Sequence, residues 1–293
     1  MTKSPRCLVS ALAVLGALVV WQEPAQAAGN VTGGVSGTNR LLKLRGDNAG
    51  NAIHVSATGV PNEVKVEGNA GTTVTANGVA ATMQTFTNVR SLKVVLGDGA
   101  DVVEIEDLVL TGVPNVVSGF IDISTAGGAD KIDVCDTVVA GDTEIKTGVG
   151  NDTITLSTSD FRNRLEVTTS DGMDIVNTDL ISVGAAGPSN FHRQFNVNAG
   201  RQVDVITSRN DTFHGPVKVE GQEGNDTITS QGSTFMGRVM WFGHENDDCF
   251  RIGDSTFMML VELIGGSGRN GFDDLGNNTF NGGLTPRNIA GAC

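Results

Sequence analysis

The chain has 293 residues, of which 39 are glycine and none is tyrosine, and its formal net charge is −13. A hydrophobic content of 39% is too high for a disordered chain, and seven prolines are too few for a proline-rich linker protein. The acidic balance argues against a nucleic-acid binder, because phosphate binding needs clustered lysine and arginine. What remains is an acidic, turn-rich, compact protein.

Residues 1–27 have the pattern of a secretory signal peptide. Lys3 and Arg6 form a positive n-region, residues 7–21 are mostly apolar, and residues 25–27 (Ala-Gln-Ala) fit a cleavage site. The apolar stretch is too short for a transmembrane helix, and no later stretch is long enough for one. We therefore expect a secreted protein, extracellular or periplasmic, that does not insert into a membrane.

An aspartate recurs after this segment at intervals of 22 residues, with two longer intervals of 29 and 30. We call these residues the markers. They are Asp101, Asp130, Asp152, Asp174, Asp204, Asp226 and Asp248, and Asn270 ends the series. The register extends backwards, more weakly, to Thr73 and Asn51. Such self-similarity at a fixed period is typical of repeat architectures.

Apolar residues keep a constant phase relative to the markers. Valine, isoleucine or phenylalanine stands two residues after most markers, and apolar residues stand seven and nine residues before them with a mostly polar residue between. This alternation predicts a half-buried strand. Thirteen residues before the marker lies an aromatic series, which consists of Phe161, Phe191, Phe213, Phe235 and Phe257.

The fold class that these features favour is an all-β, right-handed parallel β-helix, or solenoid, of about ten 22-residue coils. Equivalent residues would stack about 4.8 Å apart, and the crossover rule gives the right-handed winding. A two-sheet sandwich is the alternative, but the strict recurrence favours the solenoid. We assign residues 51–280 to the solenoid, 28–50 to an N-terminal cap and 281–293 to a C-terminal cap or tail.

Three coils are longer than the others. Their extra residues fall at about 77–87, 107–116 and 179–190, which in a solenoid is the same corner of each coil. Loops gathered on one side of a rigid rod are a plausible place for function, although surface insertions are also simply tolerated.

Three cysteines follow the signal peptide, and Cys249 and Cys293 could form a bridge at the C-terminal end.

The turns before the markers are rich in glycine. Residues 97–103 (Gly-Asp-Gly-Ala-Asp-Val-Val) and 148–154 (Gly-Val-Gly-Asn-Asp-Thr-Ile) are the clearest examples. They resemble the nonapeptide GGxGxDxUx of RTX (haemolysin-type) calcium-binding repeats. The family repeats this motif every nine residues, whereas here it occurs once per 22. Gln202 and Asn246 also replace the glycine two residues before their markers.

The resemblance implies calcium as a cofactor and the aspartate markers as its ligands. The implied metal ligands are Asp101, Asp130, Asp152, Asp174, Asp204, Asp226 and Asp248. Like charges stacked in register are destabilising, and a hard cation with oxygen ligands would relieve the repulsion. The alternative is that each aspartate accepts hydrogen bonds from its own turn, without a metal.

Two surface clusters are further candidates. Asp122, Glu144 and Glu166 share one outward phase and could hold a cation, be neutralised by Lys146 or form a solvated acidic face. The weak catalytic candidates are His192, His214 and Arg162, which share another phase and would supply a base and a charge neutraliser to a polysaccharide lyase.

We therefore expect a secreted, non-catalytic solenoid with a structural, adhesive or surface-associated role and with calcium as a candidate stabiliser. Its expected partners are extracellular polysaccharide or cell-surface components. The alternative is a polysaccharide lyase or hydrolase, because β-helices often carry such enzymes.

Overall fold

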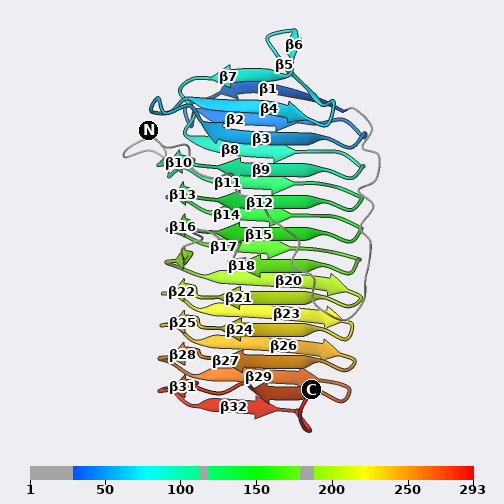
Figure 1. The fold of residues 1–293 in the computed structure, drawn as a ribbon, viewed down its shortest axis with the longest axis vertical. Helices are drawn as coiled ribbons and strands as arrows, with labels where there is room; N and C mark the ends of the chain where they lie inside the picture. The colour runs from blue at the N-terminus through cyan, green and yellow to red at the C-terminus, as the bar shows by residue number, and fades with distance from the viewer. Residues whose placement is uncertain (1–28, 112–117, 179–187) are drawn as a thin grey trace.

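The computed structural model describes residues 29–111, 118–178 and 188–293. The predicted signal peptide lies outside these residues. The described residues form strands and turns without a helix, so no helix among them could cross a membrane. Figure 1 shows the strands stacked as rungs along one axis.

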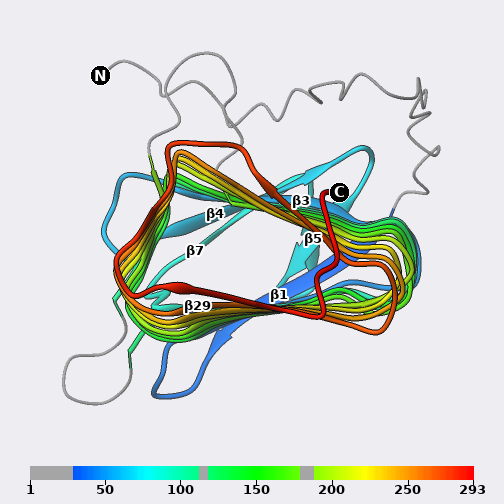
Figure 2. The ribbon, with the colours of Figure 1, turned by 90° about the horizontal axis from the view of Figure 1, so that it is seen from below.

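Three sheets run along the rod, and successive coils superpose when the rod is viewed along its axis (Figure 2). The first, sheet A, has 13 strands, in spatial order β32 (Leu284–Arg287), β29 (Val261–Gly266), β26 (Val239–Glu245), β23 (Val217–Glu223), β20 (Phe195–Arg201), β17 (Leu165–Thr168), β14 (Thr143–Lys146), β11 (Ile121–Ser124), β8 (Ser91–Val95), β2 (Leu41–Arg45), β1 (Asn30–Ser36), β5 (Thr73–Ala76) and β6 (Val79–Ala81).

The other two sheets complete each coil. Sheet B has 11 strands, in spatial order β30 (Gly271–Asp274), β27 (Cys249–Gly253), β24 (Thr227–Gln231), β21 (Val205–Arg209), β18 (Ile175–Thr178), β15 (Thr153–Ser157), β12 (Lys131–Cys135), β9 (Val102–Glu106), β3 (Ala52–Ala57), β4 (Val64–Asn69) and β7 (Met83–Phe86). Sheet C has eight, namely β10 (Val109–Leu110), β13 (Val138–Val139), β16 (Asp160–Phe161), β19 (Asn190–Phe191), β22 (Thr212–Phe213), β25 (Thr234–Phe235), β28 (Thr256–Phe257) and β31 (Thr279–Phe280).

The strands of neighbouring coils pair in parallel with the register that the 22-residue period predicts. Ile132 of β12 lies opposite Ile154 of β15, and Ile145 of β14 lies opposite Val167 of β17. These four side chains are buried, whereas their strand neighbours such as Glu144 point outward and are only partly buried. The structure thus confirms an all-β parallel solenoid with a core of stacked apolar side chains.

The phenylalanines of sheet C form one continuous stack inside the rod. Phe213 lies with its ring centroid 4.7 Å from those of both Phe191 and Phe235, and the planes differ by 8° or less. The stack continues to Phe257 at 4.6 Å from Phe235. From Phe161 to Phe280 each coil therefore places its phenylalanine over the one before, whereas Leu110 and Val139 occupy this position in the first two strands of the sheet.

The turn between sheets A and B explains part of the glycine excess. A Cβ on Gly150 would lie 1.7 Å from the carbonyl oxygen of Gly128 in the preceding coil, and φ of Gly150 is +143°. Both facts require glycine. Gln202 and Asn246 replace glycine in this phase and take positive φ angles of 78° and 81°, so the turn keeps its left-handed backbone.

The N-terminal end differs from the prediction. The extension of the register to Thr73 is wrong, because β2 pairs directly with β8 and β3 with β9. Strand β4 instead pairs antiparallel with β3 and with β7, while β5 pairs with β1 and β6. This excursion covers the first coil, where a parallel solenoid would otherwise expose unpaired strand edges.

Both predicted caps contribute a strand to sheet A. Strand β2 lies in the predicted N-terminal cap and β32 in the C-terminal one, yet both extend sheet A in parallel. The long segment 77–87 contains β6 and β7 of the N-terminal excursion and is not an insertion into a regular coil. Residues 112–117 and 179–187, which hold most of the other two insertions, lie outside the described residues.

Candidate functional site: the aspartate column

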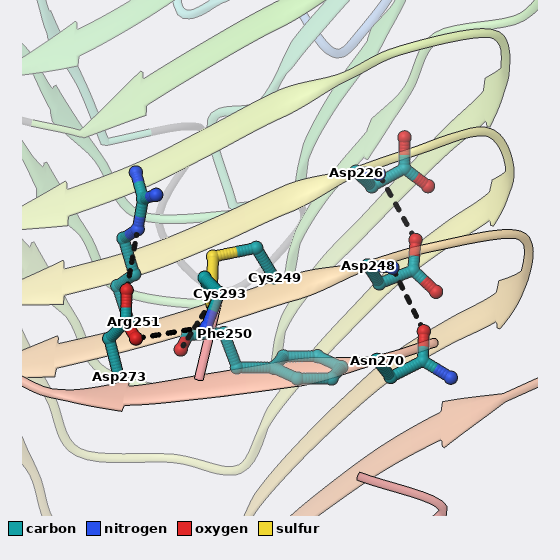
Figure 3. Close-up of a disulfide and its surroundings, with 8 residues drawn as sticks. All are labelled: Asp226, Asp248, Cys249, Phe250, Arg251, Asn270, Asp273 and Cys293. Carbon is teal, nitrogen blue, oxygen red and sulfur yellow. Dashed lines mark hydrogen bonds and ion pairs between the residues drawn. A yellow bond between two sulfur atoms is a disulfide. The ribbon is translucent and has the colours of Figure 1, made fainter. Parts of the chain in front are cut away.

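The structure brings all seven aspartate markers into one column at the turn that leads into sheet B. We call these seven residues the aspartate column, and Asn51 and Asn270 continue it at its two ends. Every one of its carboxyl groups is buried, with exposed fractions between 0% and 3%. Figure 3 shows the last two members, Asp226 and Asp248, with Asn270 continuing the column beyond them.

One oxygen of each carboxyl group links neighbouring coils. Oδ1 of Asp152 accepts a hydrogen bond from the backbone N–H of Asp130 at 2.9 Å, and Oδ1 of Asp174 accepts one from the N–H of Asp152 at 2.8 Å. The same bond recurs at every step from Asn51 to Asn270, with lengths from 2.7 to 3.0 Å. The acceptors thus serve the preceding coil, and not their own turn as the metal-free alternative predicted.

The second oxygen, Oδ2, has no hydrogen-bond partner in any of the seven aspartates, and each is fully buried. The residue five positions before the marker faces this oxygen. At Gly221 and Gly243 an added Cβ would lie 2.2 Å and 1.9 Å from Oδ2 of Asp226 and Asp248. Burial of a polar atom without a hydrogen-bond partner costs folding free energy. A proton or a cation on Oδ2 would remove this cost in each coil.

Three coils add a hydroxyl group beside the carboxyl group. Thr125 and Thr147 lie close enough to lower the pKa of Asp130 and Asp152, although outside the geometry of a good hydrogen bond. Thr169 lies beside Asp174 in the same way. In the other coils the corresponding residue is glycine, alanine or leucine.

Burial raises the pKa of every member of the column. It brings the pKa to about 7 in Asp101, Asp152 and Asp248, to about 8 in Asp204 and to about 6 in Asp226. The pKa of Asp130 and Asp174 is raised as well. The main cause is desolvation of the charged form, and repulsion between neighbouring carboxylates adds to it in most members.

The donor set of the column fits a hard cation, because every side-chain ligand that it offers is oxygen. No three carboxylates of the column lie within 4.8 Å of one another in the described structure. A cation at the column would therefore need further oxygen ligands besides the carboxylates, and the threonine hydroxyls of three coils are candidates.

A second buried polar series runs parallel to the column, and the sequence interpretation missed it. Seven residues after the marker, Oγ of Ser159 accepts a bond from the N–H of Thr137 at 3.2 Å, and Oγ of Ser255 accepts one from the N–H of Ser233 at 3.3 Å. Asp211 occupies the same position in its coil. The Ser-Thr-Phe triplet that recurs in the sequence is the pattern from which this series could have been predicted.

The predicted acidic face is neutralised within the sheet. Lys93 pairs with Asp122, Lys146 pairs with Glu144, and Arg164 pairs with Glu166 at 3.1 Å. An open groove of about 360 Å³ lies over these residues. Its lining includes Asp122, Asp142, Glu144 and Arg164.

The three weak catalytic candidates do come together. The rings of His192 and His214 stack with centroids 4.8 Å apart. Oδ1 of Asp160 lies 2.8 Å from Nε2 of His192, and Oδ2 accepts a hydrogen bond from Nε of Arg162 at 2.8 Å. All three candidates are exposed on the corner between sheets C and A.

The C-terminal tail is fixed to the last coil. Cys249 and Cys293 form a disulfide, and the N–H of Phe272 donates to the carbonyl of Gly291 at 2.8 Å.

No protein-family model, curated protein or solved structure matches this chain.

Proposed function

We propose that this protein is a secreted structural or adhesive solenoid whose aspartate column takes up Ca²⁺ at neutral pH. The observation that supports the proposal best is the series of seven buried Oδ2 atoms without hydrogen-bond partners. A protonated carboxyl group or a bound cation would each resolve this, and a cation is the solution that operates above the raised pKa values.

The turn sequences support calcium in particular. The glycine-rich turns resemble RTX repeats, and the column offers only oxygen atoms, which is the ligand type that Ca²⁺ prefers. A rigid rod with a cation-stabilised edge suits a role outside the cell, where calcium is abundant. Extracellular polysaccharide or cell-surface components remain the proposed partners, and a secreted location accords with the Cys249–Cys293 disulfide.

The test is a metal analysis of the mature protein, purified without chelator. We expect bound calcium in the parent protein and less in a variant in which Asp152 and Asp226 are both replaced by asparagine. Asparagine keeps the Oδ1 acceptor and occurs naturally at both ends of the column, so the variant should fold. Equal calcium contents near zero in both proteins would refute the proposal.

A polysaccharide lyase or hydrolase remains the second candidate. The stacked His192 and His214 with Arg162, and the groove that Glu144 and Arg164 line, are the observations that favour it. The test is the release of products from a panel of acidic and neutral polysaccharides. Activity that is lost in both His192→Ala and Glu144→Gln would establish an enzyme, and inactivity on the whole panel would leave the structural role.

A further inference from the structure

The outer face of sheet B carries a cluster of potential metal ligands that lies apart from the aspartate column. Glu106 at the end of β9 lies opposite Cys135 at the end of β12, and Asp136 follows directly. A carboxylate oxygen of Glu106, Sγ of Cys135 and a carboxylate oxygen of Asp136 all lie within 4.8 Å of one another. One thiol and two carboxylates thus converge from two adjacent coils.

A histidine from the neighbouring strand lies beside this cluster, in contact with Glu106. Nε2 of His54 in β3 lies 3.2 Å from Oε2 of Glu106, and Nδ1 lies 3.5 Å from Oε2 of Glu67. The imidazole is therefore held between two carboxylates and fixes the orientation of Glu106. Groups of this kind around metal ligands position them and tune their affinity.

The charge of this region favours a cation. Partial burial raises the pKa of Asp136, and repulsion from the carboxylates of Asp107 and Glu106 raises it further. Lys65 pairs with Glu67, the second carboxylate beside His54, at 2.9 Å. A divalent ion between the carboxylates of Glu106 and Asp136 would relieve the repulsion between them.

The ligand types separate this cluster from the aspartate column. A thiolate is a soft ligand that Ca²⁺ does not select, whereas Zn²⁺ binds cysteine, histidine and carboxylate side chains together. The other coils do not repeat the set. The position of Cys135 is occupied by Ser157, Arg209, Gln231 and Gly253 in later described coils.

We propose that Glu106, Cys135 and Asp136 form a binding site for Zn²⁺ or a similar borderline-soft divalent ion, with His54 as a positioning residue. Three protein ligands leave a fourth position for water or an external ligand. The site is built into the scaffold at the second and third coils and is independent of the proposed calcium sites.

The test uses the mature protein, stripped with chelator and then titrated with Zn²⁺ in excess Ca²⁺, so that hard-cation sites do not contribute. We expect one Zn²⁺ per chain, and with Co²⁺ an absorption band from thiolate-to-metal charge transfer. Cys135→Ser should abolish the band and lower Zn²⁺ affinity more than about tenfold. This variant should fold, because Ser157 is buried in the same register one coil later.

Two more variants separate a ligand set from a general structural effect. His54→Gln should lower Zn²⁺ affinity about tenfold and keep the Co²⁺–thiolate band, as expected for a positioning residue. Asp136→Asn should weaken binding, whereas Asp254→Asn, the matched aspartate in a coil with Gly253, should not. The proposal is overturned if the parent protein binds no Zn²⁺, or if Cys135→Ser binds Zn²⁺ and Co²⁺ as the parent does.

Discussion

The backbone N–H of Asp226 donates a hydrogen bond to Oδ1 of Asp248 one coil later, at 3.0 Å, while Oδ2 of Asp248 is buried without a partner (Figure 3). The two oxygens of one carboxyl group thus have different roles. The first ties two coils together, and the second is the atom that we propose takes up a proton or a cation.

Without divalent cations, the protein should lose stability as the pH rises. The pKa values of the column are raised from 3.8 to between about 6 and about 8 in five members. Because the folded state binds protons more tightly, its extra stability is fully present below pH 4 and is lost as the pH rises to about 8. Urea unfolding in EDTA at several pH values measures this trend. Stability that is constant or rises over this range would contradict the raised pKa values.

Asp226→Asn should stabilise the metal-free protein at pH 8 by about 2 kcal/mol, because it removes a buried charge and keeps the Oδ1 acceptor. Asp226→Ala removes the same charge but also takes the acceptor from the buried N–H of Asp204, so it should be about 2 kcal/mol less stable than Asp226→Asn. Asp247→Asn is the matched control on the exposed side of the turn and should change little. Chemical denaturation in EDTA compares the three variants, and equal stability of the Asn and Ala variants at position 226 would contradict the two-role account.

Gly150→Ala should destabilise the solenoid by more than about 2 kcal/mol. The new methyl group would lie 1.7 Å from the carbonyl oxygen of Gly128, and φ of +143° is unfavourable for alanine. Gly34→Ala is the control, because a Cβ there has no neighbour within 4 Å. The melting temperatures of the two variants test this. A fall at position 34 as large as that at position 150 would show that the turn geometry is not responsible.

Cys293→Ser should loosen the C-terminal end while leaving the central coils intact. The disulfide to Cys249 holds the tail whose Gly291 carbonyl accepts the N–H of Phe272. Repeat proteins contact only their neighbouring coils, so loss of the tail should affect the last coils first. Hydrogen exchange should show faster exchange around Phe272 and unchanged exchange around Ile154. Equal acceleration in both regions would indicate a global effect instead.

Much of the fold could be predicted because a parallel solenoid repeats the same physical environment in each coil. Ile132 and Ile154 recur at 22 residues and indeed pair in register. The failure at Thr73 has the same origin, because the N-terminal excursion keeps an alternating apolar pattern while pairing antiparallel. Alternation reports which side of a strand is buried, but not which strand lies beside it.

The candidate site was only partly predictable. The 22-residue period predicts that the seven aspartates lie in one column. It does not predict that Oδ1 accepts a hydrogen bond while Oδ2 has none, because this depends on the backbone direction at the turn. The cluster of Glu106 and Cys135 has no periodic signal, since it occurs in two coils only. His54 and Glu106 are also far apart in the sequence, so the contact between their side chains could not be predicted from it.

The most direct test of the central claim is the melting temperature of the protein without its predicted signal peptide at pH 8, measured in excess EDTA and in excess Ca²⁺. Calcium that binds the buried Oδ2 atoms of the folded state stabilises it by mass action. We therefore predict a higher melting temperature in Ca²⁺, with a smaller increase at pH 5, where protons occupy the column. The same melting temperature in EDTA and in Ca²⁺ at pH 8 would contradict the account.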